Sequence, residues 1–153
     1  MIKQHPRRGW LRGLALSFVA ATSLVLGSPI HPSHAADEGG LAIELNKTED
    51  TADGCRSLFL FDNATGHQLN RFQVDLILFD QDGVYSKQVV LDMAPLYAGK
   101  KMLASFLFDQ TPCAKIGSIL VNDVPRCENG TGTSMDCVGL LEVKSRSEIP
   151  LEK

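Results

Sequence analysis

Four cysteines are the residues best suited to chemistry in this sequence: Cys55, Cys113, Cys127 and Cys137. Structural zinc sites usually take their ligands from close pairs, and this sequence contains no C-x-x-C pair. The absence of that pair also argues against a thioredoxin-like or haem-attachment motif. An even number of cysteines in an exported chain therefore predicts two disulfides, with a metal site as the less favoured alternative.

The other candidate groups are few. His67 is the single histidine after residue 35, and it sits beside Gly66 in an expected turn, where a solvated side chain is typical. Asp80, Asp82 and Gly83 imitate the start of a calcium loop. Leu91 occupies the position where an EF-hand requires glutamate, so a hairpin turn is favoured there.

An acidic stretch contains Glu49, Asp50 and Asp53, which we expect in a solvated connection between two strands. Paired carboxylates for glycoside hydrolysis would need a sugar-binding cleft lined with aromatic side chains, and this chain has few aromatic residues. No glycine cluster opens a helix as a phosphate loop would require. We therefore expect no catalytic residues, no metal and no cofactor.

The first 35 residues are typical of an export signal. They carry four of the 15 Lys+Arg residues and no acidic residue, followed by an apolar stretch over residues 14–26 that is too short for a membrane span. Small residues at Ser33 and Ala35 predict cleavage after Ala35, with Ala36 as the alternative. A single domain over residues 36–153 is expected, with no membrane anchor thereafter. A twin-arginine motif is formed by Arg7, Arg8, Trp10, Leu11 and Arg12.

A general secretory signal containing two arginines by chance is the alternative. Both routes lead to the bacterial periplasm, or to secretion.

All 18 Asp+Glu residues follow residue 35, so the remaining chain is acidic and has no basic stripe. That charge distribution excludes nucleic acid as an expected partner.

The elements that would position these groups are strands. Short apolar or alternating runs occupy residues 41–46, 55–61, 71–79, 85–92, 102–108, 116–121 and 137–144. The clearest period of two lies in residues 71–79, and Asp82-Gly83 is a strong hairpin signal after it. Seven short strands with turn signals between them predict an all-β fold, an immunoglobulin-like sandwich of about seven antiparallel strands.

This strand order constrains the disulfides. If consecutive strands alternate in direction, Cys55 and Cys113 lie at one end of the sandwich, and Cys127 and Cys137 at the other. The expected bonds are therefore Cys55–Cys113 and Cys127–Cys137.

The connection over residues 122–136 is longer than a hairpin needs, and two cysteines flank its tip. A bond between them would restrict the loop and lower the ordering cost of binding a partner. We expect a partner-binding loop here, with an acidic tip; a loop stapled only against proteases is the alternative. Its residues are Glu128, Asn129, Gly130, Thr131, Gly132, Thr133, Ser134, Met135 and Asp136.

Three stretches carry a family resemblance: residues 76–84 (LILFDQDGV), residues 96–100 (LYAGK) and residues 106–108 (FLF). They resemble exported bacterial immunoglobulin-like domains of the FxLYD type. With its signal and four cysteines, the whole chain is similar to small alphaproteobacterial exported proteins known only as Tat pathway signal proteins. The resemblance implies the fold and the export route, and it supplies no catalytic residue.

The sequence favours a non-catalytic periplasmic accessory or binding module with an unidentified protein partner. One alternative is a structural partner of a cell-envelope complex that docks by an edge strand. A thiol–disulfide role for Cys127 and Cys137 is the remaining enzymatic hypothesis.

Overall fold

The computed structural model describes residues 39–153, most of which form strands. The export motif from Arg7 to Arg12 and the cleavage position at Ala35 lie outside the described residues. Eight strands, one short helix and one 3-10 turn follow in the order β1 (Leu41–Thr51), β2 (Gly54–Asn63), β3 (Leu69–Phe79), β4 (Tyr85–Asp92), β5 (Lys100–Asp109), η1 (Cys113–Lys115), β6 (Ser118–Asn129), α1 (Cys137–Leu140), β7 (Leu141–Ser145) and β8 (Leu151–Glu152).

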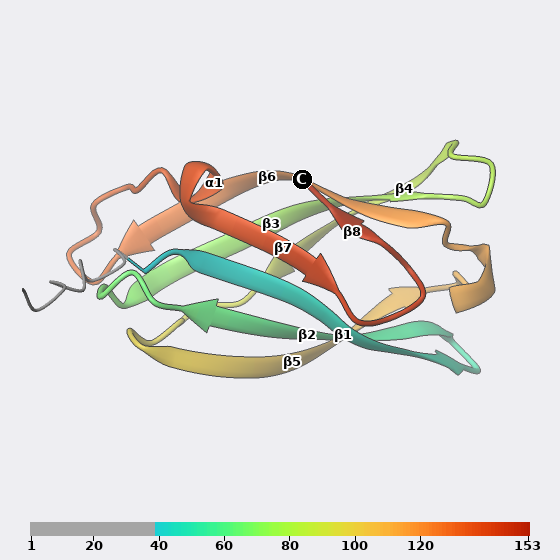
Figure 1. Ribbon diagram of the computed structural model, residues 1–153, viewed down its shortest axis with the longest axis horizontal. Coiled ribbons are helices and arrows are strands. Elements are labelled where there is room, and N and C mark those ends of the chain that lie inside the picture. Colours follow the sequence, from blue (N-terminus) through green and yellow to red (C-terminus); the bar gives the residue numbers. More distant parts are fainter. Residues whose placement is uncertain (1–38) are drawn as a thin grey trace, which may run out of the picture. The chain divides into compact units, whose positions relative to one another are not determined.

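Two four-stranded sheets make up the fold, and they pack as a sandwich (Figure 1). The first sheet has the order β5-β2-β1-β7 and the second β4-β3-β6-β8. The all-β prediction is confirmed. The expectation of uniformly antiparallel strands is wrong, because β1 pairs with β7 and β6 pairs with β8 in parallel. Neither parallel pair is joined by a hairpin turn, so no turn imposes an antiparallel direction.

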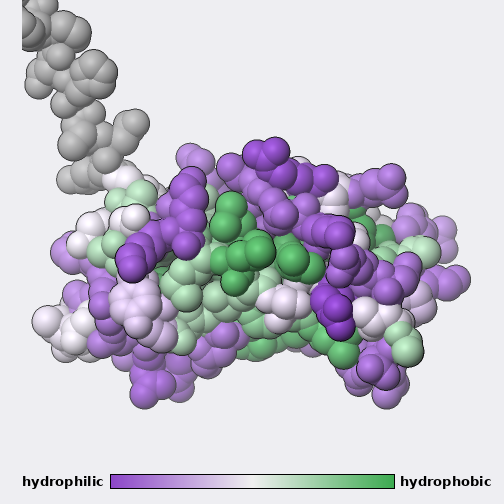
Figure 2. All heavy atoms as spheres, turned by 90° about the horizontal axis from the view of Figure 1, so that it is seen from below, coloured by the Kyte–Doolittle hydropathy of each residue, from purple (hydrophilic) through white to green (hydrophobic). Residues whose placement is uncertain are grey.

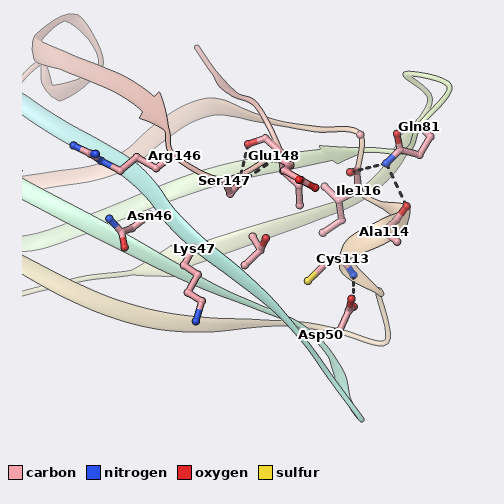
Figure 3. Close-up of a pocket in the computed structure, with 13 residues that line it drawn as sticks. Asn46, Lys47, Asp50, Gln81, Cys113, Ala114, Ile116, Arg146, Ser147 and Glu148 are labelled. Carbon is pink, nitrogen blue, oxygen red and sulfur yellow. Dashed lines mark hydrogen bonds between the residues drawn. The ribbon is translucent and has the colours of Figure 1, made fainter.

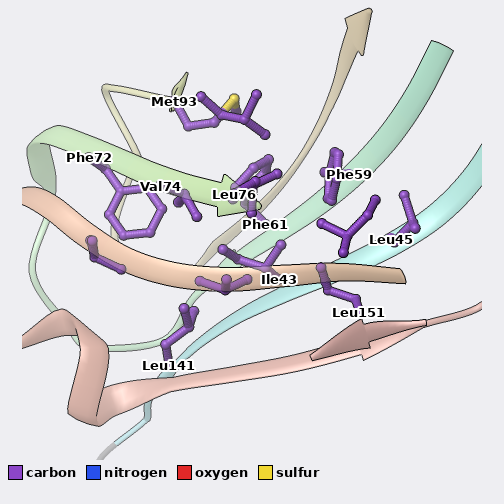
Figure 4. Packing of buried hydrophobic residues seen from close by; sticks show 14 of the residues in the cluster. Ile43, Leu45, Phe59, Phe61, Phe72, Val74, Leu76, Met93, Leu141 and Leu151 are labelled. Atoms are coloured by element: carbon purple, nitrogen blue, oxygen red, sulfur yellow. The ribbon is translucent and has the colours of Figure 1, made fainter. Parts of the chain in front are cut away.

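The core lies between the sheets and is built by alternation along the central strands (Figure 4). Phe59 and Phe61 point inward from β2, and Phe72 points inward from β3. The rings of Phe61 and Phe72 meet edge to face at 6.3 Å, which joins one sheet to the other. Full burial of each such side chain contributes about 1.5–3 kcal/mol.

The two disulfides join the pairs expected from the sequence. Cys55 is bonded to Cys113, with Cα atoms 4.7 Å apart, and this bond ties η1 to the start of β2. Cys127 is bonded to Cys137, with Cα atoms 6.2 Å apart, and this bond ties α1 to β6. Two disulfides are typical of an oxidising compartment, extracellular or periplasmic.

The predicted bounds of the last two strands, and the long connection predicted between them, are wrong. Strand β6 continues to Asn129, so only residues 130–136 connect it to α1, and α1 replaces the start of the expected strand over 137–144. Register shifts in the β3–β6 ladder break the period of two in this half of β6. Pro125 fits because β6 pairs with β8 only at Ile119 and Leu120, which leaves its remaining outer edge without a strand.

Candidate functional site

Apart from the cysteines, the side chains considered for chemistry do not come together: His67 precedes β3, and Asp80 and Asp82 follow it. His67 is exposed in the β2–β3 turn, where its backbone carbonyl accepts from Asn63 Nδ2 at 2.8 Å. Asp80 Oδ1 accepts from the N–H groups of Asp82 and Val84 in the β3–β4 hairpin. Between residues 39 and 153, no three His, Cys, Asp or Glu side chains are placed to hold a metal ion.

Of the acidic stretch, only Asp53 lies in the exposed connection that the sequence predicts. Glu49 and Asp50 lie within β1, because β1 and β2 form one long hairpin that turns only at residues 52–53. A hydrogen bond from Lys47 lowers the pKa of Glu49. Asp50 Oδ1 accepts from the Cys113 N–H at 2.8 Å and so holds η1 against β1.

A cleft of about 670 Å³ lies between β1, η1 and the turn that follows β7 (Figure 3). Two of its polar side chains are hydrogen-bonded within the fold. Gln81 Nε2 donates to the carbonyls of Ala114 and Ile116, and Arg146 Nε donates to Glu44 Oε1 at 2.9 Å.

Glu44 is a buried charge with its partners in place. It is 3% exposed, and it accepts from Asn46 Nδ2 at 2.8 Å while Lys144 Nζ lies 3.3 Å away. The Asn46 hydrogen bond, followed by those from Arg146 and Lys144, lowers the pKa of this carboxyl against the opposing effect of burial. The group pins β1 to β7, which is a structural role.

The expected partner-binding loop is a short, internally bonded turn. Asn129 Oδ1 accepts from the N–H groups of Thr131 and Thr133 at 3.0 and 2.9 Å. The negative charge of Glu128, expected to make the loop acidic, is balanced by two arginines. Glu128 Oε2 lies 3.6 Å from Arg71 Nε, and Glu128 Oε1 lies 3.9 Å from Arg126 Nη1. Met135 is half-buried. Gly130, Gly132 and Ser134 are exposed with the two threonines.

Asp136 has a structural use as well. Its carboxylate accepts from the Gly139 N–H at 3.1 Å and caps α1. This helix and β6 are joined by the Cys127–Cys137 bond, so the disulfide holds a well-bonded turn rather than a long loop. Partner binding by this loop stays a prediction.

Strand β5 has a long, regular outer edge that no other described strand pairs with. It ends the first sheet, and its ten residues pair with β2 alone, without a register shift, from Lys100 opposite Asn63 to Asp109 opposite Gly54. Residues 102–108 (MLASFLF) contain no charge, proline or glycine. Natural edge strands are normally short, bulged or charged, because a regular apolar edge invites another strand.

The other three edges are protected in those ways. Strands β7 and β8 have five and two residues. Strand β4 has eight, but its ladder with β3 is shifted beside Phe79. β5 is the edge in residues 39–153 that combines length, regular pairing and an uncharged centre.

Both faces of β5 carry apolar side chains. On the outer face of the sheet, Leu103 is 58% exposed and Leu107 is 43% exposed. On the other face, Met102, Ala104 and Phe106 are only partly buried against the core. β5 follows the lower rim of the molecule in Figure 1, and the view from below in Figure 2 shows a green apolar area framed by purple side chains.

Charges stand at the ends of this strand. Lys101 Nζ lies 2.8 Å from Asp62 Oδ2, and this carboxylate raises the pKa of Lys101. Asp109 lies opposite Gly54, which has no side chain to meet it.

The sequence predicted docking by an edge strand without identifying which strand. The signal that could have located it is the apolar character of residues 102–108 at both odd and even positions.

Comparison of the chain with protein-family models, curated proteins and solved structures gave no match. Within residues 39–153, no helix has the length and apolar character to cross a membrane.

Proposed function

We propose that this chain is a non-catalytic, exported protein-binding module that binds its partner by adding a strand to the free edge of β5. The observation that carries the proposal is the ten-residue, regular, uncharged-centred edge of β5 with two exposed leucines. The same proposal includes three further expectations: the sandwich is immunoglobulin-like, the chain is exported by the twin-arginine route, and it acts in the periplasmic cell envelope.

Strand addition suits this edge energetically. Alternate backbone groups of an antiparallel edge strand point away from its one neighbour and are available to a new strand. Each hydrogen bond formed there contributes about 0.5–1.5 kcal/mol net. Leu103 and Leu107 would meet the side chains on one face of an added strand, and Met102 and Phe106 would meet those on the other, which gives the edge selectivity.

A thiol–disulfide enzyme is less well supported. Exchange requires that a thiolate reach one sulfur of the disulfide. Cys127 and Cys137, which the thiol–disulfide hypothesis concerns, are both 4% exposed or less. The 130–136 loop is less well suited to a partner than β5, because its polar groups bond to one another.

A site-specific photocrosslinker tests the proposal against the loop hypothesis. We would place p-benzoylphenylalanine at Ser105, in the centre of β5, or at Ser134, in the loop, and irradiate cells that export the chain. The proposal predicts protein adducts at Ser105 and none at Ser134. Adducts at Ser134 alone, or no adduct at Ser105, would overturn it.

A further inference from the structure

We infer that the strand added to β5 is β5 of a second copy of this chain, paired antiparallel about a two-fold axis at Ser105. This inference rests on the proposed function and names the partner of the same edge. The two first sheets would join into one continuous eight-stranded sheet. A two-fold interface of this kind is self-complementary, so each contact occurs twice.

The geometry of the sheet limits the possible registers. Odd-numbered residues of β5 lie on the outer face, with exposed Leu103 and Leu107, whereas even-numbered residues face the core side. In a continuous sheet, opposed residues must share a face. The two-fold axis must therefore pass through a residue position rather than between two residues.

The register centred on Ser105 matches charges at both ends. It places Lys101 opposite Asp109 of the second copy, and Leu103 opposite Leu107. On the core side, Met102 lies opposite Phe108, and Ala104 opposite Phe106. Between residues 101 and 109, every cross-strand pair in this register is thus either oppositely charged, apolar, or the central serine pair.

The neighbouring registers lack this match. A two-fold axis at Ala104 places Lys101 opposite Leu107, and an axis at Phe106 places Leu103 opposite Asp109. Each of those arrangements would put a charge against an apolar side chain. The register at Ser105 is therefore the one that the sequence of β5 favours for self-pairing.

The two charged residues have complementary surroundings in the single chain. The side chain of Lys101 is 67% exposed and is already directed along the outer face by Asp62. Asp109 has no ion pair with another described side chain. The second copy would supply the cation that Asp109 lacks, and Lys101 would lie between two carboxylates. This charge complementarity favours a second copy over an unrelated strand.

One contact must be released. Lys87 Nζ of β4 donates to the Asp109 backbone carbonyl, at the end of the free edge. Its side chain is long and its contact is exposed, so it can move to solvent as the strands pair. The remainder of the edge, including Ser105, carries no such contact from β4 among the described hydrogen bonds.

A charge-reversal cycle tests the register on the purified, disulfide-bonded chain. Sedimentation equilibrium over about 1 to 100 μM measures the dimer dissociation constant. K101D and D109K each place like charges opposite one another twice, and we expect each to weaken dimerisation about tenfold. The double variant K101D/D109K restores opposite charges and should recover most of the loss.

K100D is the matched control. It makes the same charge change one residue away, but leaves the Lys101–Asp109 pairs intact, so dimerisation should change much less. Thermal unfolding of each variant monitors folding. S105K is a second disruptive variant at an exposed position, and it places two ammonium groups beside the two-fold axis.

A monomeric wild-type chain across that range, or a double variant no better than the single ones, would overturn the inference. The proposed function fails by a different result. Ser105 adducts with other proteins, together with a monomeric purified chain, would leave strand addition standing and replace only the occupant. Absence of every Ser105 adduct would remove both.

Discussion

Leu103 lies opposite Leu60 in the β5–β2 ladder, yet Leu103 remains 58% exposed. Within its own sheet the side chain has a neighbour on one side only, because β5 is the last strand. An apolar residue in this position on a regular edge would be the structural basis of the proposed association through β5.

Replacing Leu103 by lysine should weaken association through β5 about tenfold or more, because a charge then replaces an apolar cross-strand contact. Stability of the single chain should change by less than about 0.5 kcal/mol, since the side chain is largely exposed. Sedimentation and thermal unfolding measure the two effects. Val90→Lys, on the other long edge strand, is the matched control and should leave association unchanged. Equal weakening by both variants would contradict a β5-specific interface.

The two disulfides should contribute unequally to stability. In the loop-entropy model, the Cys55–Cys113 bond contributes about 4 kcal/mol and the Cys127–Cys137 bond about 3 kcal/mol, because the first closes the larger loop. Urea unfolding of the C55A/C113A and C127A/C137A chains would measure the loss for each bond. Greater destabilisation on loss of Cys127–Cys137 would contradict this order.

Glu44 should make stability fall on acidification. Its folded-state pKa is lowered from the ordinary 4.5, chiefly by the Asn46 hydrogen bond. The stabilisation is therefore complete above that ordinary value and is lost as pH falls through the lower folded-state pKa. Urea unfolding between pH 7 and the acid limit should show a smaller loss in Glu44→Gln than in the unaltered chain. An identical pH dependence in the two chains would show that Glu44 does not contribute.

Export should depend on the arginine pair at the N-terminus. Replacing both Arg7 and Arg8 by lysine should leave the precursor in the cytoplasm, because the twin-arginine signal is read by its receptor as a specific pair. Cell fractionation followed by immunoblotting measures the distribution. Unchanged export would favour the general secretory route.

Locally encoded features of the fold were predictable from the sequence. Phe72, Val74 and Leu76 alternate with the polar residues Gln73 and Asp75, and together with Leu78 they are buried in the core. The hairpin after β3 was predictable from Asp82-Gly83, where Gly83 has a φ of 76°.

Features set by tertiary pairing were not predictable in this way. Val121, Val124 and Cys127 are buried at intervals of three, because the β3–β6 register shifts between them, so β6 did not resemble a strand beyond Val121. The position of β5 at the rim depends on which sheet each connection enters. The sequence therefore predicted partner binding at the loop ending at Asp136, whereas the edge of β5 is the site proposed with the strand order known.

Amide hydrogen exchange along β5 tests the central claim most directly. Exchange in a peptide covering residues 102–108 would be compared at low and high protein concentration, with a peptide from β4 as the internal reference. Pairing of β5 with a second copy predicts slower exchange in the β5 peptide at high concentration and no change in β4. Exchange in β5 that is independent of concentration would contradict the account.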